Sequence, residues 1–137
     1  MALENTPTAK LMIRALRKFE RELQVRLHAD GYTDVTVAHT NVLRHLNPEG
    51  MRLIALAADA GMTKQGVSQA VRALQARDLV AVEPDPDDRR AKRVVYTPRG
   101  LMLIACAIAH ITAIEREWSD GLGADRYQGL RQSLSDL

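Results

Sequence analysis

The segment from Lys64 to Arg77 has the periodicity of an amphipathic helix with two different faces. Val67, Val71 and Leu74 follow an i, i+4, i+7 spacing and form the apolar face. The opposite face, which has no apolar or acidic side chain, carries Lys64, Gln65, Ser68, Gln69 and Arg72. Side chains of these types hydrogen-bond base edges in the major groove of DNA. The pattern is typical of a DNA-reading helix, although a helix face exposed to water carries the same residue types.

A turn with the chemistry of a helix-turn-helix precedes this segment. Two helices that cross steeply need a small residue at the crossing, which Ala57 provides, and a residue that tolerates unusual backbone angles in the turn, which Gly61 provides. Thr63 is expected to cap the second helix, where its hydroxyl also lies in reach of a DNA phosphate.

A basic hairpin follows the helix-turn-helix. The runs 79–82 and 93–96 are rich in β-branched residues, and the connection between them is rich in Pro and Asp. We expect an antiparallel hairpin whose charged tip enters the DNA minor groove, where the negative potential attracts cations; the candidates are Arg89, Arg90 and Lys92. The acidic residues beside them indicate local salt bridges that orient some of the arginines; these are Asp85, Asp87 and Asp88.

Helical periodicity predicts the remaining elements. The expected helices cover about 7–29, 34–46, 49–60, 64–77, 98–120 and 124–137. This order predicts a mostly α fold: a winged helix-turn-helix with a two-stranded β-wing, and long N- and C-terminal helices that form a dimer interface. We divide one continuous structural domain into an N-terminal dimerisation helix, a DNA-binding lobe and C-terminal dimerisation helices, at 1–33, 34–98 and 99–137.

Composition and charge agree with a soluble protein of the cytoplasm. The 137 residues suffice for one domain, and a single cysteine excludes an intramolecular disulfide. The longest uninterrupted apolar run has nine residues, from Leu101 to Ala109, so no membrane-spanning segment is expected, and no signal peptide is visible. Because that run is apolar on nearly every face, one lobe can hardly cover it, which indicates a homodimer.

These residues resemble the MarR family of winged-helix transcriptional regulators. The stretch 61–74, GMTKQGVSQAVRAL, looks like the family's recognition helix, and 84–100, PDPDDRRAKRVVYTPRG, is similar to its wing. The family's Asp-x-Arg-Ala pattern falls on Asp88, Arg90 and Ala91. Many members carry an acidic residue where this chain has Arg72, so their clamp between helix and wing must be absent or rebuilt here.

The resemblance implies a homodimer that places two winged lobes on successive major grooves of a near-palindromic site. It implies Arg90 as the minor-groove reader, with Asp88 orienting the wing. It also implies a small phenolic or anionic effector between the dimer helices and the lobe, for which Arg14, His39 and His45 are candidates by position. We therefore expect a sequence-specific regulator of transcription that binds double-stranded DNA, most often a repressor in this family.

Other functions fit the sequence less well. Cys106 and His110 share a helix face at i, i+4 and could hold a metal ion with a distant histidine, or Cys106 could sense peroxide, but a lone cysteine among apolar residues is usually inert packing. No catalytic motif is present, so neither an enzyme, a metal site nor a cofactor is expected. The main alternative is a winged-helix module that binds proteins instead of DNA.

Overall fold

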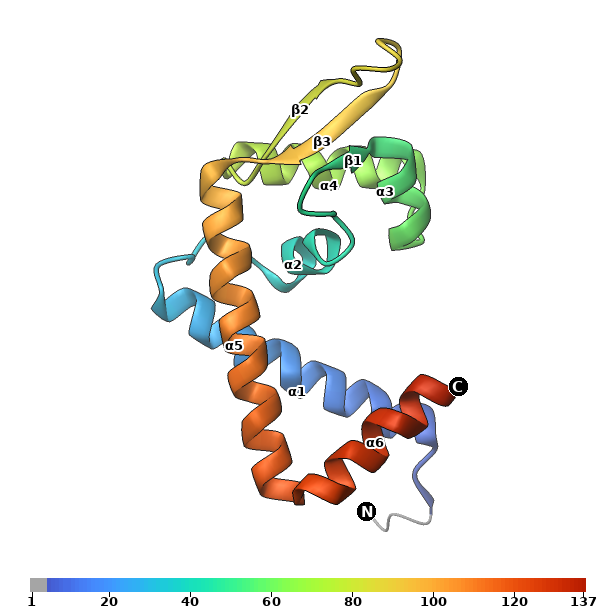
Figure 1. The fold of residues 1–137 in the computed structure, drawn as a ribbon, viewed down its shortest axis with the longest axis vertical. Coiled ribbons are helices and arrows are strands. Elements are labelled where there is room, and N and C mark those ends of the chain that lie inside the picture. The colour runs from blue at the N-terminus through green and yellow to red at the C-terminus, as the bar shows by residue number, and fades with distance from the viewer. Residues whose placement is uncertain (1–4) are drawn as a thin grey trace.

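The computed structural model describes residues 5–137. In chain order the elements are α1 (Thr8–Ala29), α2 (Val37–Leu43), β1 (Met51–Arg52), α3 (Leu53–Ala60), α4 (Lys64–Ala76), β2 (Val80–Pro84), β3 (Lys92–Tyr96), α5 (Pro98–Leu122) and α6 (Ala124–Asp136). Figure 1 shows a lobe of α2–α4 and the sheet at one end of the molecule, and α1 with α6 at the other. The long helix α5 connects the two ends. The mostly α winged helix expected from the sequence is confirmed.

The sheet has three antiparallel strands in the order β1-β3-β2. Strands β2 and β3 form the wing, with Val80 opposite Tyr96 and Pro84 opposite Lys92. The two-residue strand β1 pairs with the base of β3. The helix expected over 49–60 is therefore wrong at its start, because residues 49–52 are not helical. Helix α3 begins only at Leu53, and two residues are too few to show strand alternation.

Helix α2 is shorter than the expected 34–46. It begins after Thr36, whose side chain accepts a hydrogen bond from the backbone N–H of His39. In return, Nδ1 of His39 accepts a hydrogen bond from the Thr36 N–H over 2.9 Å, which completes a capping box. His39 thus fills the place that Glu or Gln takes in most capping boxes.

The core joins the lobe to α5 and α1. Val67, Val71 and Leu74 are buried, as the periodicity of α4 predicted, and Leu56 and Ala57 meet them from α3. Gly61 ends α3 in the left-handed conformation at φ 64°, as expected for the turn. The apolar stripe of α4 therefore fixes which of its faces points away from the protein.

Helix α5 packs on α1 through aromatic and polar contacts. The rings of Phe19 and Trp118 meet edge to face at 5.6 Å, and the Trp118 indole N–H donates to Glu22 over 3.1 Å. Arg26 pairs with Glu117 at 2.6 Å. These contacts hold the lower half of α5 against the N-terminal helix.

By length and composition alone, α5 is long and apolar enough to cross a membrane, contrary to the expectation from uninterrupted apolar runs. The two results differ because a mean hydropathy over a long stretch of the helix can be high even when polar residues interrupt the apolar run. Leu103 and Ile114 of α5 are fully buried inside the protein, and Arg99 at its start pairs with Asp34 at 3.0 Å. We interpret α5 as a packing helix of the fold.

Candidate nucleic-acid interface

Helix α4 presents its polar face outward. Thr63 caps the helix: its hydroxyl accepts a hydrogen bond from the backbone N–H of Gly66 over 3.0 Å. Since the apolar stripe is buried, the opposite side chains point away from the core. Lys64, Gln65, Gln69 and Arg72 are exposed, and Ser68 is half-buried. The structure therefore brings the five polar residues of α4 together on one surface, as their spacing predicted.

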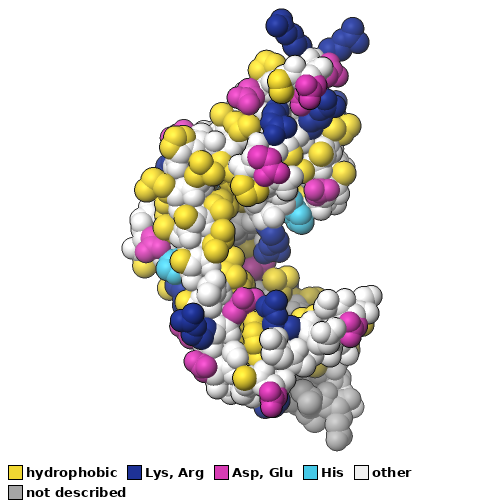
Figure 2. Space-filling view, viewed as in Figure 1, with side chains coloured by type: hydrophobic (Ala, Val, Ile, Leu, Met, Phe, Trp, Pro, Cys, Tyr) yellow, Lys and Arg dark blue, Asp and Glu magenta, His cyan; other side chains and the backbone are white. Residues whose placement is uncertain are grey.

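The wing carries the second group of cations. Arg89, Arg90 and Lys92 lie at its tip and at the start of β3, and all three are exposed. In Figure 2, cationic side chains gather at the wing end of the molecule and project beyond its surface. The tip of the wing is therefore a projecting, positively charged element, as the hairpin pattern predicted.

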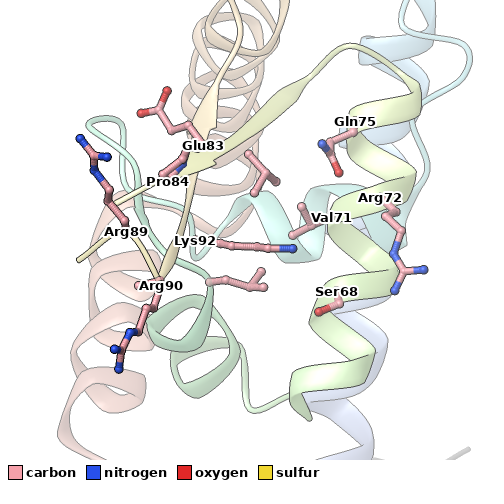
Figure 3. Close-up of a pocket in the computed structure, with 12 residues that line it drawn as sticks. Ser68, Val71, Arg72, Gln75, Glu83, Pro84, Arg89, Arg90 and Lys92 are labelled. Carbon is pink, nitrogen blue, oxygen red and sulfur yellow. The ribbon is translucent and has the colours of Figure 1, made fainter. Parts of the chain in front are cut away.

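A hollow of about 600 Å³ separates α4 from the wing. In Figure 3, Lys92 points across this hollow toward α4, whereas Arg89 and Arg90 point away from the helix. The side of the hollow formed by α4 carries Ser68 and Arg72. Cations and hydroxyls on two walls of one open groove can bind a phosphate backbone from both sides.

The polar side chains of this surface have no partner among the described residues. Across residues 5–137, no hydrogen bond or ion pair engages the side chains of Lys64, Gln65, Ser68, Gln69, Arg72, Arg89, Arg90 or Lys92. Other arginines of the lobe are engaged: Arg93 donates to the carbonyls of Glu49 and Gly50, and Arg77 to that of Asp34. Within the lobe, the cations without a described partner therefore lie on α4 and the wing, where a ligand can reach them.

Two aspartates shape the wing tip. Asp88, the expected orienting residue, accepts a hydrogen bond from the backbone N–H of Arg90 over 3.0 Å and does not contact the guanidinium group. Asp85 is buried, and it accepts hydrogen bonds from the backbone N–H groups of Asp87 and Asp88 at 2.9 and 3.2 Å. It also pairs with Arg52 at 3.0 Å.

The expected local salt bridge between Asp85 and an arginine of the wing is wrong, because Asp85 pairs instead with Arg52, which sequence reasoning missed. The hydrogen bond from Arg52 holds the pKa of Asp85 below its usual value, and the two backbone N–H groups lower it further. The run of Pro and Asp over 84–88 signals a local turn, because Asp side chains accept hydrogen bonds from the backbone two residues on. Nothing in the spacing of 33 residues links Arg52 to that turn.

The three residues suggested for an effector do not form one site. Arg14 is exposed on α1, beside a hollow of about 600 Å³ that it lines with Arg17, Lys18 and Arg21. His39 belongs to the capping box of α2, and burial lowers its pKa. His45 is half-buried beyond the end of α2. Neither histidine lines the hollow beside Arg14.

The pair Cys106 and His110 has other neighbours. His110 contacts the carboxylate of Asp30 at 2.5 Å, and Cys106 is half-buried on α5 beside Tyr32. Within the described part of the chain, no three His, Cys, Asp or Glu side chains are grouped so that they could hold a metal ion.

Comparisons with known proteins agree with this architecture. Residues 33–91 match the model of the MarR family. The crystal structure of CouR from Rhodococcus jostii RHA1 bound to p-coumaroyl-CoA is 25% identical, with a TM-score of 0.73 over 98% of this chain and 92% of that one. No curated protein matches the chain.

Two further structures share the fold. CouR bound to a 23-mer DNA duplex is 24% identical, with a TM-score of 0.75 over 95% of this chain and 91% of that one. A crystal structure of MarR is 21% identical, with a TM-score of 0.76 over 96% and 94%. Residues 33–91 are therefore similar to the MarR family, and the chain as a whole shares the winged-helix fold of MarR and CouR.

Proposed function

We propose that this protein is a transcriptional regulator that binds double-stranded DNA in a sequence-specific manner through α4 and the wing. One observation carries the proposal: among the described residues, the cationic and amide side chains on the outer face of α4 and at the tip of the wing have no partner, while the neighbouring Arg77 and Arg93 do. Unpaired cations on a projecting surface are suited to phosphates, which dominate the affinity of such complexes.

Each element has a role in this proposal. Helix α4 enters the major groove, where Gln65, Gln69 and Arg72 reach base edges, and Lys64 and Ser68 lie near the backbone. The N–H groups at the start of α4, next to Thr63, favour a phosphate. Arg90 enters the minor groove, and Arg89 and Lys92 hold the flanking phosphates. The neighbour CouR has been solved bound to a 23-mer DNA duplex, which supports the binding of DNA by this fold.

The proposed DNA-binding form is a homodimer built from residues 1–33 and 99–137. None of the residues of α6 is buried in the single chain, although Leu130, Leu134 and Leu137 follow one stripe. On α1, Met12 and Leu16 are also about half exposed. A second copy that covers these side chains would remove apolar surface from water and place two lobes side by side on a near-palindromic site.

We further propose that a small phenolic or anionic effector releases this protein from DNA, so that it acts as a repressor. CouR has been crystallised with p-coumaroyl-CoA, an anionic aromatic thioester. Of the three candidate residues, Arg14 has the most suitable surroundings, since the hollow that it lines carries four cations. His39 and His45 are less suitable, because they lie outside that hollow. No enzymatic activity belongs to this proposal, and the protein would act in the cytoplasm.

The protein-binding alternative has less support. Exposed apolar anchors are expected on a surface that binds proteins. Among the described residues, none of the large exposed apolar side chains lies between residues 80 and 96. The wing instead presents Arg, Lys and Asp.

The proposal can be tested by selection of bound duplexes from a random-sequence pool, followed by sequencing. The expected result is one enriched motif with two related halves about ten base pairs apart. Sedimentation of the complex should give two protein chains on each duplex. Recovery of unenriched sequence, with no preference over the starting pool at moderate salt, would contradict a sequence-specific regulator.

A further inference from the structure

Among the described residues, the tip of the wing (85–91) has one polar connection to the rest of the lobe. Within residues 85–91, the other hydrogen bonds of the tip are internal to the wing: the Asp85 N–H donates to the Ala91 carbonyl, and the Ala91 N–H to the Asp88 carbonyl. The exception is the pair between Arg52 and Asp85. Its two contacts join Nε to Oδ2 at 3.0 Å and Nη2 to Oδ1 at 3.3 Å.

This ion pair spans the sheet. Arg52 belongs to β1, and Asp85 follows β2, which is two strands away in the order β1-β3-β2. The side chain of Asp85 is 4% exposed and that of Arg52 is 43% exposed, so the carboxylate is enclosed beneath the guanidinium group. A guanidinium that contacts both oxygens of a carboxylate fixes their relative orientation as well as their distance.

The recognition helix makes no comparable connection to the wing. Among the described residues, no side-chain hydrogen bond or ion pair joins α4 to residues 80–96, and Arg72 has no protein partner. Arg52 also immediately precedes α3, where it makes no side-chain capping bond. The guanidinium group of Arg52 therefore bonds to the wing and does not cap α3.

We propose that Arg52 is a positioning residue, which holds the wing tip at a set place relative to α4 through Asp85. The inference rests on the proposed function and deepens it. Arg89 and Arg90 follow Asp85 closely in the chain, so they move with the tip. If the tip moves freely in the unbound protein, conformational entropy is lost when Arg90 enters the minor groove. The contribution of Arg90 to DNA affinity then falls.

A double-mutant cycle tests this coupling. The probe is a labelled duplex recovered from the random-sequence pool, and the variants are Arg90→Ala, Arg52→Ala and their combination. In the wild-type background, we expect Arg90→Ala to weaken binding about tenfold. In the Arg52→Ala background, the same change should weaken binding less than about twofold, because the positioned contact is already lost. Lys64→Ala should cost the same factor in both backgrounds, since α4 is unaffected.

A second measurement reads the wing without DNA. Backbone order parameters of Arg89 and Arg90, from nitrogen-15 relaxation, should fall from about 0.85 to below about 0.6 in Arg52→Ala. Asp85→Asn should act in the same way, because its side chain still accepts the two backbone N–H groups but loses the ion pair. Asp87→Asn is the matched control and should leave both values unchanged, because the Asp87 carboxylate is exposed and unpaired.

The outcomes are distinguishable. Unchanged order parameters in Arg52→Ala would overturn the inference whatever the DNA result. The inference would also be overturned if Arg52→Ala lowers the order parameters but Arg90→Ala still weakens binding about tenfold in that background. The tip would then be mobile without any consequence for DNA binding. If the wild-type protein selects no duplex at all, the proposed function fails, whereas the order parameters still decide whether Arg52 holds the wing.

Discussion

Gly100, in the first turn of α5, lies directly against the backbone carbonyl of Leu79, which precedes the wing. A Cβ atom at position 100 would overlap the Leu79 oxygen, and it would also lie only 3.1 Å from the Tyr96 ring. Nearby, Thr97 donates from its hydroxyl to the Asp78 carbonyl over 2.5 Å and caps α5 by accepting from the Gly100 N–H. The base of the wing is thus packed tightly onto the start of α5.

This contact predicts that Gly100→Ala destabilises the protein. The extra methyl group must displace backbone, so the free energy of unfolding should fall by about 1–3 kcal/mol, measured by urea denaturation. Gly121→Ala is the matched control, because a Cβ there meets nothing within 4 Å. Equal stability of Gly100→Ala and the wild type would show that α5 can move away from Leu79 at little cost.

Arg90 should contribute more to DNA affinity than a cation elsewhere on the surface. We expect Arg90→Ala to weaken binding of the selected duplex by about 1–3 kcal/mol, measured by fluorescence anisotropy. Arg116→Ala removes the same charge from an exposed, unpaired position on α5 and should cost far less. Equal losses of DNA affinity in the two variants would mean that Arg90 contributes only through the net charge of the protein.

Substitutions on α4 should separate DNA binding from assembly. Lys64→Ala should lower the slope of log affinity against log salt by about one, because one phosphate contact is lost. Gln65→Ala should weaken binding of the selected duplex while leaving that slope unchanged. Sedimentation should give a dimer for both variants. A monomer would mean that this face of α4 belongs to the subunit interface.

The apolar stripe of α6 should control self-association. Leu134→Glu places a charge on a side chain that is 48% exposed in the single chain and covered in the proposed dimer, so the apparent mass should fall toward that of a monomer. Gln128→Glu on the same helix adds a charge at an exposed polar position and is the control. A dimer that tolerates Leu134→Glu would place the interface elsewhere.

The ion pair of Asp85 predicts a particular pH dependence. Arg52 and two backbone N–H groups lower the pKa of Asp85 below its ordinary value of 3.8 in the folded state. The stabilisation by the ionised form is therefore present above the unfolded pKa, and it is lost as the pH falls through the folded pKa. Urea unfolding should show Asp85→Asn less stable than the wild type at pH 7, with the difference shrinking in strong acid. A difference that stays constant down to pH 2 would contradict the ionised pair.

The helix-turn-helix could be predicted from the sequence because its determinants are local. The burial of Val67, Val71 and Leu74 follows from helical spacing, and the turn at Gly61 follows from glycine's freedom at positive φ. The same periodicity correctly indicated which side chains of α4 lie on its exposed face.

The missed features depend on contacts between distant segments. Strand β1 has two residues, and it exists because β3 pairs with it at Met51 and Arg52. The partnership of Arg52 with Asp85 arises from the same pairing, which no local pattern reveals.

The expected bounds of α2 were wrong at both ends. Thr33-Asp34 resembles a helix start and Asn47-Pro48 a helix end, but Thr36 caps the helix and its last residue is Leu43.

The most direct test of DNA recognition by α4 and the wing is fluorescence anisotropy with the duplex from upstream of this protein's own gene, beside a scrambled duplex, across a salt series. We predict selective binding, with log affinity falling linearly as log salt rises, and a smaller slope when Arg89, Arg90 and Lys92 are replaced by Ala. Equal affinity for both duplexes at every salt concentration, or a slope that the triple substitution leaves unchanged, would contradict the account.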